Sequence, residues 1–116
     1  MIEPEFREIC LSFPGVQEGT HYGKPAFLVG KKFLTRLRRE DASAVLMDVD
    51  FDEREMLMEA EPGTFHLTWH YREYNCVLAR IDSLHPGSLR AFLERRWRKI
   101  APKKDVKAWG AAKVQS

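Results

Sequence analysis

The sequence has little cysteine and no long apolar run, and both absences exclude classes of protein. Its two cysteines, Cys10 and Cys76, lie inside apolar patterns, where reduced core residues are expected more often than a disulfide if no export signal is present. No stretch approaches the roughly 20 apolar residues that a membrane-spanning helix needs. The opening, MIEPEFREICLSF, has neither the basic start nor the apolar run of a signal peptide. We therefore expect a cytoplasmic protein without membrane contact.

The sequence also lacks the short motifs around which many active sites are built. No serine stands in a G-x-S-x-G pattern, and no phosphate-binding loop or dinucleotide fingerprint occurs. Cys76 lies in a predicted strand without a base nearby, which is unfavourable for a thiolate nucleophile. His66 and His70 share a predicted strand face, but four residues of strand separate them by about 13 Å, too far for one zinc ion. We expect no catalytic residue, no metal site and no cofactor, and therefore not an enzyme.

What is present fits a single globular domain over residues 1–116. The chain is 44% hydrophobic and 31% charged, which is close to an ordinary globular composition, and 116 residues leave little room for a second domain. Short connections without β-α-β alternation favour an α+β fold. We expect an antiparallel β-sheet of about five strands with helices packed on one face.

The expected helices and strands follow from apolar spacing. Helices are predicted at 2–13, from Asp52 to 61, at 86–100 and in a short tail around Val106 and Trp109. Strands are predicted at 16–22, 26–29, 32–38, 44–49, 64–70 and 76–81. Strict alternation places three residues of each longer strand toward the core: Phe33, Thr35 and Leu37 in one, and Phe65, Leu67 and Trp69 in the other. The opposite face of the first of these strands carries Lys32, Leu34, Arg36 and Arg38.

Two helix starts are marked by local chemistry. Asp52 and Glu55 resemble a capping box, with Phe51 and Met56 placed as a hydrophobic staple. Pro86 suits the first turn of the long helix, whose apolar stripe is formed by Leu89, Phe92, Leu93, Trp97 and Ile100. On a helical wheel Arg96 falls inside that stripe, so it must reach solvent or meet an acidic partner. We expect it to form a structural ion pair.

The charges are polarised along the chain although the net charge is only +2. Residues 24–39 contain six basic side chains and no acidic one, whereas residues 40–61 contain nine acidic side chains and only Arg54 to oppose them. Residues 90–113 contain nine basic side chains against Glu94 and Asp105. A basic strand face could follow a phosphate backbone. Alternatively, basic and acidic segments could neutralise each other across the sheet, for instance with Arg36 diagonal to Asp48.

The order and spacing of several segments resemble the MmcQ/YjbR family. The segments are FPGV with Glu18 and Gly19, YGKPAF at 22–27, GKKF at 30–33, VDFDERE at 49–55, HYR at 70–72 with VLAR at 77–80, and WRKIAPK at 97–103. The resemblance implies a compact α+β fold similar to the CyaY and secretion-chaperone architectures. It also implies DNA binding through two β-hairpin wings, which would correspond here to the turn at Gly30 and Lys31 and the turn at 71–74. It implies no catalytic residues.

Three functional hypotheses remain open at this point. The first is a DNA-binding protein that contacts phosphates through the basic hairpin and the last helix, at Lys31, Lys32, Arg36, Arg38, Arg39, Arg72, Arg95, Arg98 and Lys99. The second is an adaptor that binds a protein partner through an exposed sheet face or the acidic segment 40–61. The third is a small-ligand-binding domain with a pocket near Tyr22, His70 and Tyr71. The sequence leaves the oligomeric state open.

Overall fold

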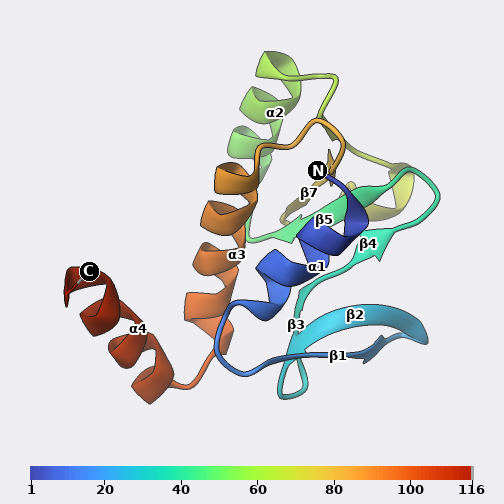
Figure 1. Cartoon of the computed structure of the whole chain (residues 1–116). Coiled ribbons are helices and arrows are strands. Elements are labelled where there is room, and N and C mark those ends of the chain that lie inside the picture. The colour runs from blue at the N-terminus through green and yellow to red at the C-terminus, as the bar shows by residue number, and fades with distance from the viewer. Residues whose placement is uncertain (116) are drawn as a thin grey trace.

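The computed structural model describes the backbone of residues 1–115 and the side chains of residues 1–111, and it combines helices with two antiparallel sheets (Figure 1). Its helices are α1 (Glu3–Leu11), α2 (Phe51–Ala60), the short 3-10 helix η1 (Trp69–Tyr71), α3 (Pro86–Ile100) and α4 (Lys103–Gln115). One sheet has the order β1-β2-β3, with strands Val16–His21, Lys24–Val29 and Lys32–Thr35. The other has the order β4-β5-β7-β6, with strands Leu37–Arg38, Ser43–Met47, Cys76–Arg80 and Phe65–His66.

The α+β class and the antiparallel pairing are confirmed. The expected helices all form, and every expected strand segment contributes residues to a strand. The strands lie in two sheets instead of one sheet of about five strands. In the described part of the chain, no helix is both long and apolar enough to cross a membrane. The side chain of Lys113, one of the nine basic residues in segment 90–113, lies outside the described residues.

The predicted strand 32–38 joins the two sheets. Its first part, β3, pairs with β2, and its second part, β4, pairs with β5. Between them Arg36 is in neither strand, although its carbonyl accepts a hydrogen bond of 3.0 Å from the backbone N–H of Val45. The chain therefore passes from one sheet to the other within a single extended segment, and the two sheets are fixed relative to each other at this point.

A β-bulge in this segment overturns the predicted alternation. Leu28 pairs with Phe33 and Phe27 pairs with Thr35, so Leu34 is an extra residue without a partner on β2. One extra residue shifts the side chains that follow it. Leu34, expected beside the basic residues, is fully buried in the main core, and Phe33 is instead half-buried on the other side of the strand.

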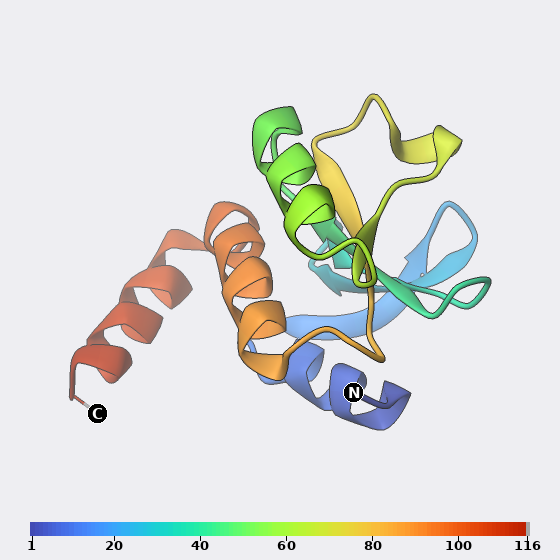
Figure 2. The same cartoon turned by 90° about the horizontal axis from the view of Figure 1, so that it is seen from above.

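The four-stranded sheet is apolar on both faces. Ala44, Leu46, Val77 and Ala79 face the main core, where they meet α1 through Phe6 and Ile9 and α3 through Leu89, Leu93 and Trp97. The alternate residues Val45, Cys76 and Leu78 form a smaller cluster on the opposite face, packed with Phe33, Met47 and Tyr71. Figure 2 shows α1 on one side of this sheet and η1 on the other. The second face is left with only partial cover.

Both helix starts obey capping chemistry, but one lies earlier than predicted. His85 caps α3, its Nδ1 accepting a hydrogen bond of 2.9 Å from the Gly87 N–H. Helix α2 begins at Phe51, and its cap is Asp50, whose side chain accepts a 2.8 Å hydrogen bond from the Glu53 N–H. The capping box at Asp52 and the staple are therefore wrong, because Phe51 and Met56 are both exposed. Asp50 and Asp52 are equally good N-cap residues, so the sequence alone does not show which of them caps the helix.

The predicted strand 64–70 is much shorter than its alternating pattern. Only Phe65 and His66 pair with β7, and the chain then turns into η1. Trp69, predicted to face the core, is 77% exposed. Its indole is covered by the guanidinium of Arg72, whose carbon lies 3.4 Å from the ring centroid. This contact gives the ring a cation–π partner at the surface in place of a core position.

Both cysteines are free and fully buried, as the sequence predicted. Burial raises the pKa of the Cys76 thiol to about 11, and it raises the pKa of Cys10 further above the ordinary range. A thiol held in its protonated form is a poor nucleophile. Cys76 therefore acts as a small apolar residue beneath the second face of the four-stranded sheet.

Replacing Leu34 with alanine tests the bulge. Because Leu34 is fully buried in the main core, Leu34→Ala is expected to lower the free energy of unfolding by about 2–5 kcal/mol, measured by urea denaturation. Leu28→Ala, at a half-buried position on the neighbouring strand, is the control and should cost clearly less. A loss below about 1 kcal/mol for Leu34→Ala would support the regular alternation and contradict the bulge.

Candidate ligand-binding cleft

The partly covered face of the four-stranded sheet forms the floor of a cleft with a volume of about 910 Å³. This volume lies within the range of roughly 300–1,000 Å³ that is usual for sites that enclose small ligands. Its lining comes from both sheets, from η1 with the turn after it, and from the end of α3. The lining residues are His21, Tyr22, Lys24, Lys32, Phe33, Arg36, Arg38, Glu40, Val45, Met47, His70, Tyr71, Tyr74, Cys76, Arg96 and Ile100.

The floor of the cleft is apolar. Val45 and Met47 of β5 and Cys76 of β7 alternate with residues of the main core, so they point to the opposite side of the sheet. Phe33 joins them because the bulge at Leu34 turns it to this side. An apolar floor of this kind favours a ligand with a flat or hydrophobic part.

One wall of the cleft carries Tyr22 at the tip of the β1–β2 hairpin. His21 pairs with Lys24, so the loop has two residues, Tyr22 and Gly23, and both have positive φ angles of 52° and 76°. Positive φ at both positions is the signature of the tight turn that matches the twist of a hairpin. The turn presents the Tyr22 ring to solvent, 91% exposed, beside His21 at a centroid distance of 4.4 Å.

The facing wall is a group of three rings after β6. The His70 and Tyr71 rings lie 4.8 Å apart in an edge-to-face arrangement, and the Tyr71 and Tyr74 rings lie 6.5 Å apart. In Figure 2 the tip of the β1–β2 hairpin and the η1 turn lie on the same side of the molecule. Tyr22, His70 and Tyr71, named from the sequence as a pocket rim, all line the cleft.

Arg54 holds this aromatic wall in place. Its guanidinium donates to the carbonyl of Arg72 at 2.9 Å, to that of Tyr74 at 2.9 Å and to that of Cys76 at 3.3 Å. The residue is only 8% exposed and stacks on Phe51 of the same helix. The turn at 71–75 has little regular structure, so the bonds to Arg72 and Tyr74 replace the partners that a strand or helix would supply. The sequence carried a signal for this role, since Arg54 is the single basic residue in the acidic segment 40–61.

Three cations of the cleft have no carboxylate partner. Within the described residues Lys24, Lys32 and Arg36 form no ion pair, and Arg36 donates only a 3.3 Å hydrogen bond to the Tyr71 hydroxyl. The acidic residue that lines the cleft, Glu40, is bonded to Arg38 at 3.0 Å. Hydrogen bonds from Arg38 and from its own backbone, followed by the nearby charges of Arg38 and Arg36, hold the pKa of Glu40 below its usual value. The cleft therefore carries an uncompensated positive charge.

Arg96 fulfils the structural role predicted from the helical wheel. Its Nε donates to the carbonyl of Phe33 at 2.9 Å, and its side chain forms an ion pair with Asp48 at 3.2 Å. Lys99 also approaches Asp48, at 3.6 Å. Asp48 thus pairs with α3, and the predicted diagonal pairing with Arg36 is wrong. The bend after Thr35 carries Arg36 to the cleft and away from Asp48.

Six of the nine cations predicted to bind phosphate are engaged by carboxylates. Arg38 pairs with Glu40, Arg39 with Glu3, Arg72 with Glu73, Arg95 with Glu53, Arg98 with Glu94 and Lys99 with Asp48. Most of these pairs are at the surface, where each adds little to stability. A phosphate would nonetheless have to displace a carboxylate at each of them. The three remaining cations are Lys31, which is exposed in its turn, and Lys32 and Arg36, which line the cleft.

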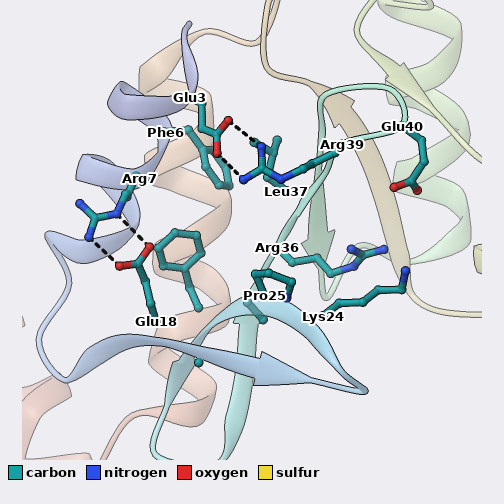
Figure 3. Close-up of a pocket in the computed structure, with 13 residues that line it drawn as sticks. Glu3, Phe6, Arg7, Glu18, Lys24, Pro25, Arg36, Leu37, Arg39 and Glu40 are labelled. Atoms are coloured by element: carbon teal, nitrogen blue, oxygen red, sulfur yellow. Dashed lines mark hydrogen bonds and ion pairs between the residues drawn. The ribbon is translucent and has the colours of Figure 1, made fainter.

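A smaller hollow of about 240 Å³ shares Lys24, Arg36 and Glu40 with the cleft (Figure 3). Its walls are two bidentate ion pairs, Arg7 with Glu18 and Arg39 with Glu3. Its floor is apolar and formed by Phe6, Pro25, Ala26, Phe27 and Leu37. The two pairs cancel their own charges and leave Lys24, Arg36 and the Arg38-bound Glu40 at the mouth.

A partly buried cluster of Ser43, His66 and Asp41 has the residue types of a hydrolytic relay but not its geometry. Ser43 Oγ lies 2.7 Å from His66 Nε2, and Asp41 approaches the same nitrogen at 3.7 Å. A relay needs the carboxylate on the other ring nitrogen and an accessible hydroxyl, and Ser43 has no exposed surface. In the described part of the chain, no three histidine, cysteine or acidic side chains gather as a metal site would need.

This geometry defines a class of protein: an α+β domain with two antiparallel sheets and a basic, aromatic cleft between them. The sequence model of the YjbR family matches residues 11–99. The chain therefore belongs to the YjbR family, as its segments suggested. The match spans the strands, α2 and nearly all of α3, and so includes almost the whole lining of the cleft. No curated protein and no solved structure matches the chain.

Removing the Arg54 side-chain charge tests the anchoring of the aromatic wall. Arg54→Met leaves the carbonyls of Arg72, Tyr74 and Cys76 without their donor and is expected to lower the free energy of unfolding by about 1–3 kcal/mol. Amide hydrogen exchange should accelerate at Tyr74 and Cys76. Arg90→Met, at an exposed position on α3, is the matched control. Equal exchange at 71–76 in both variants would contradict the anchoring role.

The His66 cluster predicts a pH dependence of stability. Burial, and after it the charge of Arg80, lower the pKa of His66 below its ordinary 6.5, and Asp41 opposes the shift only in part. The unfolded chain therefore binds the proton more readily than the folded one, so stability is complete above pH 6.5 and decreases as the pH falls below it. Thermal unfolding between about pH 7.5 and pH 5.5 should show this loss. The slope should become shallower in His66→Asn, and an unchanged slope would contradict the assignment.

Proposed function

We propose that this protein binds nucleic acid by taking an unpaired nucleotide into the cleft between its two sheets. The observation that carries the proposal is the combination in one cleft of three cations without carboxylate partners, aromatic rings on two facing walls, and an apolar floor. These are the features that single-strand-binding proteins combine, in which cations follow the phosphates and aromatic side chains stack on bases.

The cations of the cleft are suited to phosphate. Lys24, Lys32 and Arg36 come from β2, β3 and the bend between β3 and β4, so three separate segments converge on one volume. None of them has to give up an ion pair within the described residues before it contacts an anion. Arg36 already donates to the Tyr71 hydroxyl, which orients its remaining N–H groups, and an oriented guanidinium suits bidentate phosphate binding.

The aromatic residues are suited to a base that is not paired. Bases inside a duplex are stacked on each other, and a protein reaches the face of one only when that base is unstacked. Tyr22 on one wall and Tyr74 on the other are exposed and can change rotamer without disturbing the main core. A duplex lying along a flat basic stripe is supported less well, because its cations would be largely those that already bind carboxylates.

A free small ligand with an anionic group and a flat ring is the second candidate. It is favoured by the apolar floor, where Val45, Met47 and Phe33 supply apolar contacts beyond those that a base edge needs. This candidate requires the same cations and the same rings. A free small ligand would lie wholly inside the cleft, whereas a nucleotide within a strand would leave the rest of the strand outside it.

Fluorescence anisotropy of a labelled single strand tests the proposal. An oligonucleotide of about 12 bases should bind with micromolar affinity, weaken as salt is raised, and bind more tightly than a duplex of the same sequence. The double variant Lys32→Glu, Arg36→Glu should lower the affinity by about tenfold or more. Tyr22→Ala should weaken binding by a similar factor through lost stacking.

The control is a double variant with the same change in net charge away from the cleft. Lys103 and Lys104 are exposed on α4, which lies on the opposite side of the molecule from the β1–β2 hairpin tip (Figures 1 and 2). Lys103→Glu, Lys104→Glu should leave the affinity nearly unchanged. An equal loss in both double variants would identify a general charge effect and reject the cleft. Absence of binding to either nucleic acid at low salt would reject the proposal.

A further inference from the structure

Lys24 and Arg36 are shared by the cleft and by the smaller hollow, and their position defines the boundary between them. Both residues line both volumes. In Figure 3 the Lys24 and Arg36 side chains extend in the same direction, and Glu40 also lines both volumes. The two volumes therefore meet at a pair of positive groups.

This pair has the composition of an anion site. Two positive groups that line the same two volumes repel each other, and within the described residues no carboxylate forms an ion pair with either group. The carboxylate that lines both volumes with them, Glu40, is bonded by Arg38 at 3.0 Å. A phosphate between Lys24 and Arg36 would relieve the repulsion, and both sides of the site open into a volume that could hold a further part of the same ligand.

The hollow differs from the cleft in the groups that it offers. The guanidinium–carboxylate pairs Arg7–Glu18 and Arg39–Glu3 are flat and form its walls, and a base can stack on a guanidinium plane. The carboxylate oxygens of these pairs, together with those of Glu40, can accept hydrogen bonds from the amino group of a base. Phe6 and Phe27 close the floor, so the deep part of the hollow is apolar.

We propose that the ligand of this protein spans both volumes, with an internal phosphate held by Lys24 and Arg36, one ring group in the cleft and a second, amino-bearing base in the hollow. This inference rests on the proposed function and specifies it further: the unit that is recognised is a dinucleotide step within a strand. A mononucleotide fills only one volume and leaves the hollow without its ring.

Isothermal titration with two small probes tests the spanning mode. Deoxyadenosine monophosphate carries more negative charge than the dinucleoside monophosphate of deoxyadenosine, so binding by charge alone would favour the mononucleotide. Spanning reverses this order, because the second base adds its own stacking contact. The dinucleoside monophosphate is expected to bind about tenfold more tightly, the factor that one stacked base typically supplies. Adenine is chosen because its amino group can donate to the carboxylates of the hollow.

A variant that fills the hollow separates the two volumes. Pro25 is exposed and lines the hollow but not the cleft, and a proline has no backbone N–H to lose from the sheet. Pro25→Trp should abolish the advantage of the dinucleoside monophosphate and leave mononucleotide binding unchanged. Gln17→Trp is the matched control, because Gln17 is exposed on β1 and lines neither volume. It should leave the affinities of both probes unchanged.

The outcomes distinguish this inference from the proposed function. If the mononucleotide binds as tightly as the dinucleoside monophosphate, or if Pro25→Trp leaves the difference intact, the spanning mode is wrong while binding in the cleft stands. The spanning mode is also wrong if the longer single strand binds and the dinucleoside monophosphate does not. If none of the three probes binds, the proposed function is wrong and this inference fails with it.

Discussion

The passage of one extended segment from the first sheet to the second is the constraint on which the rest of this structure depends. Segment 32–38 pairs with β2 at its start and with β5 at its end, and the bulge at Leu34 changes which side chains face inward along it. The bulge places Leu34 in the main core and Phe33 on the floor of the cleft. The bend at Arg36 then brings a cation to the boundary of the cleft and the hollow. Both volumes exist because the two sheets meet at this segment.

Several arginines in this protein donate hydrogen bonds to backbone carbonyls far away in the sequence. Arg54 donates to three carbonyls of the 71–76 segment, Arg96 to the carbonyl of Phe33, and Arg95 to the carbonyl of Asp48. The carbonyls of Arg72, Tyr74 and Asp48 lie in turns or bends, that of Phe33 lies beside the bulge, and that of Cys76 is at the start of β7. A guanidinium has five donors in a fixed plane, so one side chain can satisfy several such groups. A count of basic residues therefore overstates the surface that is open to an anion.

The sequence predicted what depends on local periodicity and missed what depends on contacts between distant segments. The long helix and the ion pair of Arg96 followed from the helical wheel, because a helix fixes the direction of every side chain. The sequence contains no local signal for the bulge, since Leu34 is as apolar as its neighbours. Trp69 continues the alternating pattern of its segment, although only Phe65 and His66 of that segment pair with β7. Pairs such as Arg95–Glu53 and Arg39–Glu3 join residues 42 and 36 positions apart, so only the folded chain shows them. The tyrosine and histidine rim of the cleft was identified because those residues had no place in a predicted core.

Because many arginines are paired with carboxylates, the long-range electrostatic attraction between this protein and a polyanion is weak. Beyond a Debye length of about 8–10 Å at physiological salt, the molecule presents little more than its net charge of +2, so it generates a weak long-range field. A weak field of this kind does little to steer a charged ligand from a distance. Under the proposed function, a ligand would be discriminated by the contacts it makes inside the cleft. Duplex passing the surface would then be held only weakly, and the protein would remain free to sample single-stranded segments.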